Sequence, residues 1–301
     1  MKYMKGIIRS SLRSIVQRLL WSEICQISDL KSNFSTLEDE LNLLKIKSSA
    51  LSPSIDESLV FRKNTDDFIY DEIFVIGSGP SLLDLTQEEK NYISSKTSVA
   101  MNRYILYWDL IGIWPQFIFM ADAIGIGKKA FKQVELKLLN TEKKLPIFIL
   151  ENYFKSFVHP NLLSIFFIRD TSKGENLKWA NSLNENIFYR RGSLTCLLNV
   201  LAILRIAPVI KLIGIDLNRG GTFFDSELNR YPELINPWDQ EAKAKNVHAT
   251  VGEVYGWKGS MLDHWPDLNK NLVNAGIKVY CCNRDSLLVQ SDLSEYRPII
   301  T

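Results

Sequence analysis

The feature that most constrains the fold is an alternation, from about residue 66 onward, of short apolar runs with stretches of helical periodicity. The apolar runs have the length of strands, and the segments between them have the length of helices. This alternation is typical of a parallel sheet covered on both faces, so we expect an α/β, Rossmann-like doubly wound, mostly parallel sheet. The predicted strands are Glu72–Gly77, Ser98–Asn102, Phe117–Asp122, Leu145–Leu150, Leu163–Ile168, Val209–Asp216 and Ile277–Cys281.

A long irregular segment interrupts this alternation. A helical stretch from Ser193 to Ile206 leads directly into the strand that ends at Asp216, but from there to about Trp257 the pattern is lost. The segment is rich in Asn, Gly, Arg, Pro and aromatic residues. Loops of this length in a compact domain are usually functional lids or disordered. We therefore predict an irregular lid over residues 217–257.

The first 65 residues are predicted to form a separate α-helical extension, followed by one domain over residues 66–301. Residues 1–25 form a basic amphipathic helix, which is expected either to lie on an anionic membrane surface or to dock on a protein. A short heptad segment follows, which favours a coiled coil and a homo-oligomer, or a helix packed on its own domain. Its seam consists of Ile27, Leu30, Phe34, Leu37, Leu41 and Leu44.

Charge, hydropathy and cysteine content exclude several classes of protein. The 36 basic and 34 acidic side chains nearly balance, so the sequence gives no reason to expect nucleic acid as a partner. No apolar run approaches the roughly 20 residues that span a bilayer. Arginines interrupt the amino-terminal apolar stretch, which argues against a cleaved signal peptide. The four cysteines have no C-x-x-C spacing. We expect a cytoplasmic protein, with peripheral contact with the inner face of the cytoplasmic membrane left open.

The sharpest local motif follows the first predicted strand. Glycines there remove the Cβ atoms that would keep a phosphate away, and backbone N–H groups at the next helix start form an anion site. Leu82 replaces the third glycine of G-x-G-x-x-G, and no P-loop motif occurs, so neither dinucleotide binding nor a P-loop is indicated. The alternative is a tight strand-to-helix turn. The residues of this loop are Gly77, Ser78, Gly79, Pro80 and Ser81.

Polar residues end three predicted strands, whose carboxyl ends open into one crevice in an α/β sheet. They are Asn102, Asp122 and Asp216, although Asp122 is equally suited to capping the following helix. His248 lies in the predicted lid, where a near-neutral pKa suits a general base that deprotonates a sugar hydroxyl. The other two histidines, His159 and His264, are assigned structural roles. The sequence contains no Asp-x-Asp motif, which favours a metal-independent mechanism.

Over about residues 70–290 the chain resembles the bacterial lipooligosaccharide sialyltransferases. The resemblance implies an inverting glycosyltransferase that moves a nine-carbon ulosonic acid from a CMP-activated donor to a surface glycan acceptor, without metal or further cofactor. It is carried by motifs that follow in the family's order: Gly77–Leu82, Asn102, Arg191, Gly214–Asp216, Asn246–His248 and Cys282–Leu288.

The resemblance also implies a role for each matching residue. The loop Gly77–Ser81 would cradle the cytidine phosphate, and Asn102 would contact the phosphate or the donor sugar. Arg191 would face the acceptor or donor, and His248 would be the general base. Asp216 and Arg191 are, with His248, the candidate catalytic residues, and an Asp216 or Asp122 nucleophile would give retention by double displacement instead of inversion. The remaining predicted contacts with the nucleotide or donor sugar are Asp122, Ser193, Gly214, Asp216, Arg219 and Ser286.

Two departures from the family pattern concern the donor. The phosphate-binding tyrosines of the family's lid are absent, and Arg219, Tyr231 or Tyr255 are the candidates to replace them. The family's Thr-Ser-Gly after the arginine is altered at Ser193–Thr195, which changes the pocket expected for the donor carboxylate. Kdo, pseudaminic acid and legionaminic acid are therefore alternatives to ordinary sialic acid.

A second resemblance gives an alternative function. The same glycine loop, Ile113–Asp122 and Gly214–Leu217 are similar to the group that contains the archaeal pterin pyrophosphokinase and flagellin-glycosylating motility factors. In that interpretation the loop binds ATP, and Asp122 and Asp216 hold magnesium. A non-catalytic coiled-coil adaptor is a third hypothesis. The transferase is preferred because the segments around His248 and Ser286 fit the sialyltransferase pattern better.

Overall fold

The computed structural model describes residues 68–121, 126–159, 161–169, 176–218, 220–235, 237–246, 248–252 and 259–300. The predicted helical extension at 1–65, with its membrane-binding and heptad segments, lies outside these residues. No helix among the described residues is both long enough and apolar enough to cross a bilayer.

The described chain forms one sheet of eight strands in the order β5-β4-β3-β2-β1-β6-β7-β8. Every adjacent pair is parallel, which confirms the predicted α/β class. The strands are β1 (Glu72–Ile76), β2 (Ser98–Met101), β3 (Phe117–Met120), β4 (Ile147–Glu151), β5 (Ser164–Phe167), β6 (Val209–Ile213), β7 (Lys278–Cys281) and β8 (Glu295–Tyr296). The sequence pattern does not predict the short strand β8, because two residues are too few to show a run of apolar side chains.

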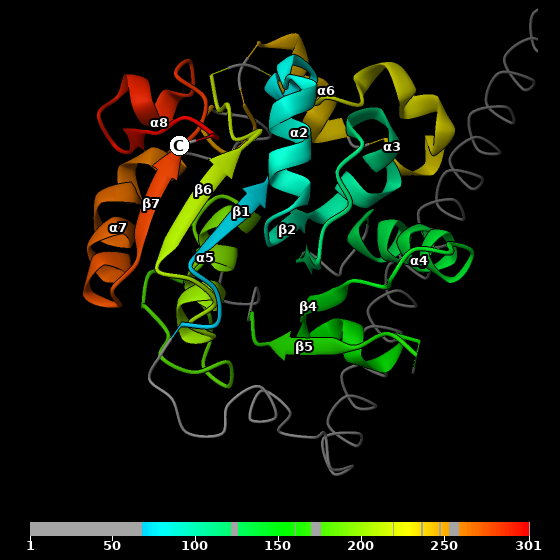
Figure 1. Cartoon of the computed structure of the whole chain (residues 1–301), viewed down its shortest axis with the longest axis horizontal. Helices are drawn as coiled ribbons and strands as arrows, with labels where there is room; N and C mark the ends of the chain where they lie inside the picture. The colour runs from blue at the N-terminus through cyan, green and yellow to red at the C-terminus, as the bar shows by residue number, and fades with distance from the viewer. Residues whose placement is uncertain are drawn as a thin grey trace, which may run out of the picture. The chain divides into compact units, whose positions relative to one another are not determined.

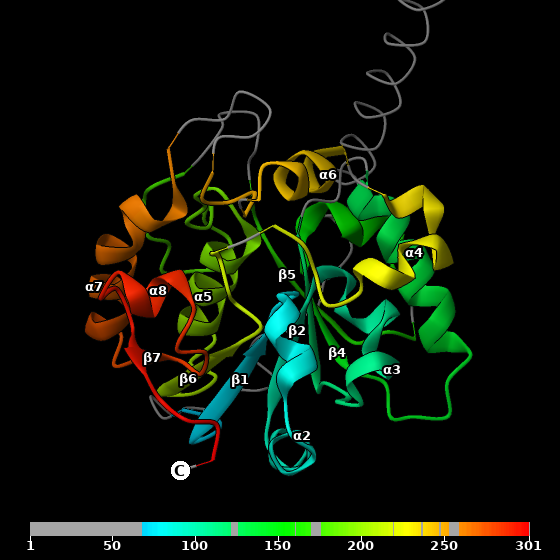
Figure 2. The same cartoon turned by 90° about the horizontal axis from the view of Figure 1, so that it is seen from above.

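Helices cover both faces of the sheet, as Figures 1 and 2 show. The α-helices are α2 (Gln87–Ser94), α3 (Trp108–Ile111), α4 (Ile126–Leu139), α5 (Ser193–Ile203), α6 (Pro237–Ala244), α7 (Trp265–Asn274) and α8 (Leu287–Gln290). The 3-10 helices are η2 (Pro80–Asp84), η3 (Asn102–Leu106), η4 (Asn152–Ser156), η6 (Asp225–Arg230), η7 (Pro232–Leu234) and η8 (Met261–His264).

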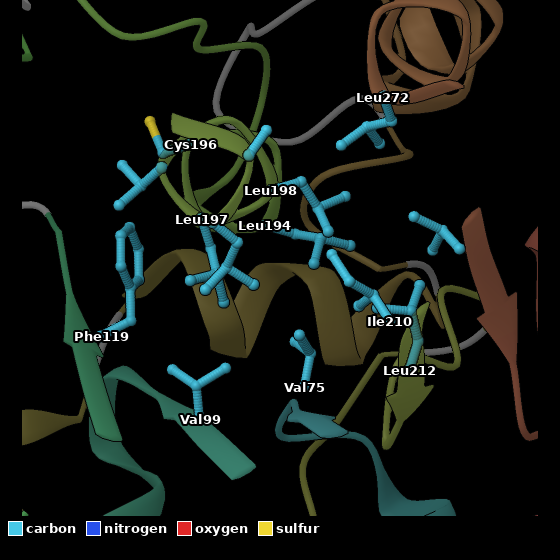
Figure 3. Close-up of a cluster of buried hydrophobic side chains, with 14 of the residues drawn as sticks. Val75, Val99, Phe119, Leu194, Cys196, Leu197, Leu198, Ile210, Leu212 and Leu272 are labelled. Carbon is cyan, nitrogen blue, oxygen red and sulfur yellow. The ribbon is translucent and has the colours of Figure 1, made fainter. Parts of the chain in front are cut away.

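The two faces of the sheet form two apolar clusters, because side chains alternate between the faces along each strand. On one face α5 and α7 pack against the strands, and on the other α2, α3 and α4 do so. Figure 3 shows Leu194, Leu197 and Leu198 of α5 lying over Val75 and Val99 of the central strands. The buried side chains of α5 hold the helix in place on this face of the sheet.

The described part of the segment predicted as an irregular lid contains three short helices that its sequence pattern does not indicate, namely η6, η7 and α6. The Pro232 and Pro237 positions that break the sequence pattern stand at the first turns of η7 and α6, where a missing N–H costs nothing. In Figure 1, α6 lies at the end of the sheet toward which the arrowheads of β1 and β6 point.

Leu197 offers a test of the packing of α5. Its side chain is fully buried, whereas Leu136 of α4 is 47 % exposed. We predict that Leu197→Ala lowers the free energy of unfolding by about 2–5 kcal/mol, because it loses apolar burial and leaves a cavity. Leu136→Ala is the matched control and should change it by less than about 0.5 kcal/mol. Equal losses in urea denaturation would contradict this placement of α5.

Candidate active site at the carboxyl ends of the strands

The strand order places a topological switch point between β1 and β6. From β1 the chain proceeds through β2 to β5 on one side of the sheet, and then returns to the other side of β1 with β6. Ligands in open α/β sheets bind in the crevice outside the carboxyl ends of the strands at such a point. The register pairs Ile76 with Ile213, so both strands end together. The predicted glycine loop and Gly214–Asp216 therefore lie side by side.

The glycines of the loop are required by this close approach of two backbones. Gly77 N–H donates to the Ile213 carbonyl oxygen at 2.9 Å, and Gly79 N–H donates to the Gly214 oxygen at 2.8 Å. A Cβ atom on Gly77 would overlap the Gly214 carbonyl, and one on Gly79 would overlap the Asp216 carboxylate. Two of the amides that we predict to cradle a phosphate are thus hydrogen-bonded within the protein, which corrects that part of the prediction.

Asp216 joins the two loops. Its carboxylate accepts hydrogen bonds from Ser81 N–H at 2.9 Å, from Ser81 Oγ at 2.5 Å and from Asn283 Nδ2 at 2.8 Å. Only 4 % of the residue is exposed. A buried carboxylate whose two oxygens both accept hydrogen bonds is suited to holding structure rather than to attacking a substrate. The geometry therefore favours a positioning role over the catalytic role that the sequence suggests.

Ser286 and Gly214 also act within the protein. Ser286 is fully buried, and its hydroxyl donates to the Ile215 carbonyl oxygen at 2.6 Å while capping α8 at Leu288 N–H. Direct contact with a nucleotide, as predicted for Ser286, does not fit this burial. Gly214 has a φ of 62°, and a side chain there would overlap Leu82. Both residues stabilise the floor of the crevice.

Two predicted residues at this edge present hydrogen-bond donors. Ser78 and Asn102 are half-buried, and in the described chain neither Ser78 N–H nor Asn102 Nδ2 donates to another residue. Asn102 has a φ of 49°, a left-handed conformation that asparagine tolerates. Its Oδ1 accepts from Ala121 N–H at 3.4 Å, which orients the amide so that Nδ2 is the donor left over. These groups can serve an anion where β1 and β2 end.

The first part of the lid packs on the glycine loop and on η3. Phe223 N–H donates to the Ser78 carbonyl oxygen at 3.0 Å. The Phe224 ring stacks on Tyr107 with centroids 4.2 Å apart, and the Tyr231 ring meets Tyr107 edge-on. Burial raises the pKa of the Tyr231 phenol above its ordinary value. Tyr231 is therefore held in an aromatic cluster with α3 and η3, which the sequence prediction of a phosphate contact did not anticipate.

A second group of predicted residues gathers at the start of α5. Because α5 leads through a short connection into the amino end of β6, its own amino end lies at the carboxyl edge of the sheet. Arg191, 7 % exposed, precedes the helix and donates from Nη2 to the carbonyl oxygens of Ala249 and Gly252 at 3.0 and 2.6 Å. Arg191 thus fastens the segment that carries His248, and Ser193 is the first residue of the helix.

His264 is a residue that sequence reasoning assigned only a structural role. Thr250 of the His248 segment accepts a main-chain hydrogen bond from Met261, the first residue of η8, and His264 ends η8. Burial lowers the pKa of His264, and the positive charge of Arg190 lowers it further. The neutral imidazole that results is the form that accepts a proton. No sequence signal other than its residue type distinguishes His264.

Three predicted contacts lie outside the described residues, namely Asp122, Arg219 and Tyr255. The described part of the chain brings together no group of three or more His, Cys, Asp or Glu side chains suited to a metal ion.

Comparisons with known proteins give similar solved structures. No family model matches the chain, and no curated protein does so. A MAf glycosyltransferase from Magnetospirillum magneticum AMB-1 is similar at 15 % identity and a TM-score of 0.44, covering 78 % of this chain and 34 % of that one. This chain thus spans about a third of that protein.

Two structures of the sialyltransferase CST-II are also similar at 17 % identity. A tyrosine-to-phenylalanine variant in complex with CMP has a TM-score of 0.46, covering 77 % of this chain and 88 % of that one. The complex with a trisaccharide acceptor and CMP has a TM-score of 0.45, covering 76 % and 87 %. The glycosyltransferases found are from the two groups that the sequence motifs resemble.

Asp216 provides a test of the joined loops. We predict that Asp216→Ala lowers the free energy of unfolding by about 2–4 kcal/mol, because it leaves the Ser81 N–H and the Asn283 amide without their acceptor. The matched control is Asp285→Ala, an exposed carboxylate two residues after Asn283, with an expected change below about 0.5 kcal/mol. Chemical denaturation measures both, and an unchanged stability of Asp216→Ala would show that the loops do not depend on this carboxylate.

Proposed function

We propose that the protein is a glycosyltransferase that moves an ulosonic acid from a CMP-activated donor to a bacterial surface glycan. The observation that carries the proposal is the fastening of the His248 segment to Arg191, at the same edge of the sheet as the switch point. That arrangement provides a candidate base and a candidate anion site on one side of the molecule. Transfer of an acyl, phosphate or sugar group needs a base and an anion site. The resemblance to the sialyltransferases favours sugar transfer among these reactions.

The donor phosphate is proposed to bind where β1 and β2 end. Ser78 N–H, the Ser78 hydroxyl and Asn102 Nδ2 are the donors available to it, and hydrogen bonds to an anion are stronger than those between neutral groups. As the glycosidic bond to CMP breaks, the phosphate gains negative charge. Donors already in position stabilise that charge without reorganisation. Arg219, which follows the crevice in sequence, is a further proposed contact.

The acceptor is proposed to bind near His248. Its hydroxyl oxygen attacks the anomeric carbon, the imidazole takes the hydroxyl proton, and CMP leaves with the electrons of the broken bond. The single displacement inverts the anomeric configuration. Ser193, at the positive end of α5, is a proposed contact for the donor carboxylate. Whether the sugar is a sialic acid, Kdo or another ulosonic acid depends on this altered Ser193–Thr195 pocket.

The location of the enzyme follows from its proposed substrates. A CMP-activated donor is made inside the cell, so we place the protein in the cytoplasm. Residues 1–25 are proposed to hold it against the inner face of the membrane, where a lipid-linked glycan acceptor would be available.

A magnesium-dependent pyrophosphokinase is the less favoured alternative. It would need Asp216 as a metal ligand, and the carboxylate would then have to give up its hydrogen bonds to Ser81 and Asn283. The hydrogen-bonded carboxylate of Asp216 therefore does not fit the role of a magnesium ligand. The other metal-ligand candidate, Asp122, is outside the described residues.

Transfer assays with a panel of CMP-activated sugars, read by mass spectrometry, test the proposal. We predict that His248→Ala lowers kcat about 100- to 10,000-fold, because the general base is lost. His159→Ala is the matched control and should keep full activity, since His159 lies in the connection from β4 to β5 and its main-chain N–H binds Glu135 of α4. Full activity of His248→Ala, or loss of activity in His264→Ala instead, would contradict the assignment of the base.

Ligand-dependent thermal unfolding distinguishes the nucleotide. We predict that CMP raises the Tm of the protein and that ATP with magnesium does not, since a ligand that binds only the folded state stabilises it by mass action. His248→Ala should show the same CMP-dependent shift as the unaltered protein. A shift with ATP and magnesium alone would favour the pyrophosphokinase.

A further inference from the structure

The lid segment that contains η6 and η7 is bonded to both loops that carry the proposed phosphate donors. At its start, Phe223 N–H donates to the carbonyl oxygen of Ser78 at 3.0 Å. At its end, the Leu234 carbonyl oxygen accepts from Arg103 Nη1 at 2.9 Å, and Arg103 directly follows Asn102 in the chain. The two residues assigned to the phosphate are therefore each linked to the lid, Ser78 through its own carbonyl and Asn102 through the next residue.

Arg103 also holds the start of this lid segment. Its guanidinium carbon lies 5.4 Å from the centroid of the Phe224 ring, and the same ring stacks on Tyr107, which caps η3. The quadrupole of an aromatic ring attracts a guanidinium over its face, and the attraction is stronger where water is excluded. Phe224 is 1 % exposed. A single half-buried arginine thus contacts the lid segment near both of its ends.

The backbone beside Arg103 has a conformation that the surrounding structure must hold. Asn102 has a φ of 49°, in the left-handed region, which costs free energy relative to the ordinary helical region even for asparagine. It is the first residue of η3, and no side chain caps this end of η3. The other end of η3 is fastened to α4, because Lys137 Nζ donates to the Leu106 carbonyl oxygen. At the end that carries Asn102, the contacts of Arg103 with the lid serve the corresponding purpose.

We propose that Arg103 is a positioning residue for the CMP-activated donor. By holding the lid segment against η3, it keeps Asn102 in the backbone conformation in which Nδ2 can donate to the phosphate. This inference rests on the proposed function, in which Asn102 binds that phosphate. Because such a coupling is reciprocal, a phosphate bound to Asn102 stabilises the docked lid segment by the same factor as the docked segment strengthens phosphate binding.

Binding of CMP to single and double variants tests whether Arg103 acts through Asn102. Asn102→Gly removes the amide, and glycine adopts this φ without strain, so the variant should weaken CMP binding about 10- to 100-fold. Arg103→Met should weaken binding at least about 5-fold in the unaltered protein, but less than about 2-fold in the Asn102→Gly protein, because no amide is left to position. Isothermal titration calorimetry measures all four proteins. Equal losses in the two backgrounds would overturn the proposal.

Two further variants control for attachment of the lid and for folding. Arg230 fastens the same lid segment at another place, where its Nη1 lies 2.8 Å from Asp109 Oδ2, and its side chain is 38 % exposed. Arg230→Met should change CMP affinity less than about 2-fold, since exposed ion pairs contribute little. A loss as large as that in Arg103→Met would overturn the specific role of Arg103. Arg103→Lys keeps the charge and serves if the methionine variant does not fold, and its loss of about 2- to 5-fold should likewise disappear in the Asn102→Gly protein.

Hydrogen–deuterium exchange gives a readout that does not depend on affinity. Saturating CMP should slow exchange in a peptide over residues 223–234 of the unaltered protein but not of Arg103→Met, while residues 77–82 are protected in both. Lid protection of equal size in the two proteins would overturn the coupling. Failure of CMP to bind the unaltered protein would refute the proposed function. In that case, faster exchange of residues 98–104 in Arg103→Met than in Arg230→Met would still establish that Arg103 holds η3, and equal exchange would overturn that role as well.

Discussion

The hydrogen bonds of Asp216 are the constraint on which the rest of the site depends. They join the loop after β1 to the loop after β6, and they do so across 135 residues of sequence. The two glycines are needed because the backbones meet without room for a Cβ atom. This arrangement leaves few backbone and side-chain donors available to a ligand. Among the described residues of this edge, Ser78 and Asn102 still offer hydrogen-bond donors, whereas the amides of Gly77, Gly79 and Ser81 are used within the protein.

The other half of the site depends on a buried arginine. Arg191 adopts a φ of 56°, and Thr195 stabilises its turn by accepting from Arg190 N–H and donating to the Gly192 oxygen. The guanidinium then reaches a segment nearly sixty residues away and fixes it at the amino end of α5. Loops carry functional groups with precision only when a rigid element holds them. In this fold α5, packed on the sheet, is that element.

The sequence predicts the sheet well and the site less completely. Apolar runs specify the strands through β7 because both faces of a parallel sheet are buried, so the pattern is continuous and strong. The glycine loop is located correctly for the same reason, since it follows the first strand. Its use of hydrogen bonds could not be predicted, because the acceptor at Gly214 becomes adjacent only through the β1–β6 pairing. The burial of Ser286 and the helices within the lid likewise depend on tertiary contacts rather than on local periodicity.

The central claim is that CMP binds where β1 and β2 end, beside the loops that Asp216 joins. Hydrogen–deuterium exchange read by mass spectrometry, with and without CMP, tests it most directly. The account predicts slower exchange in peptides that cover residues 77–82 and 98–104, and unchanged exchange in a peptide over residues 139–147 at the opposite end of the sheet. Protection confined to that opposite end, or no protection of the two loop peptides at saturating CMP, would contradict it.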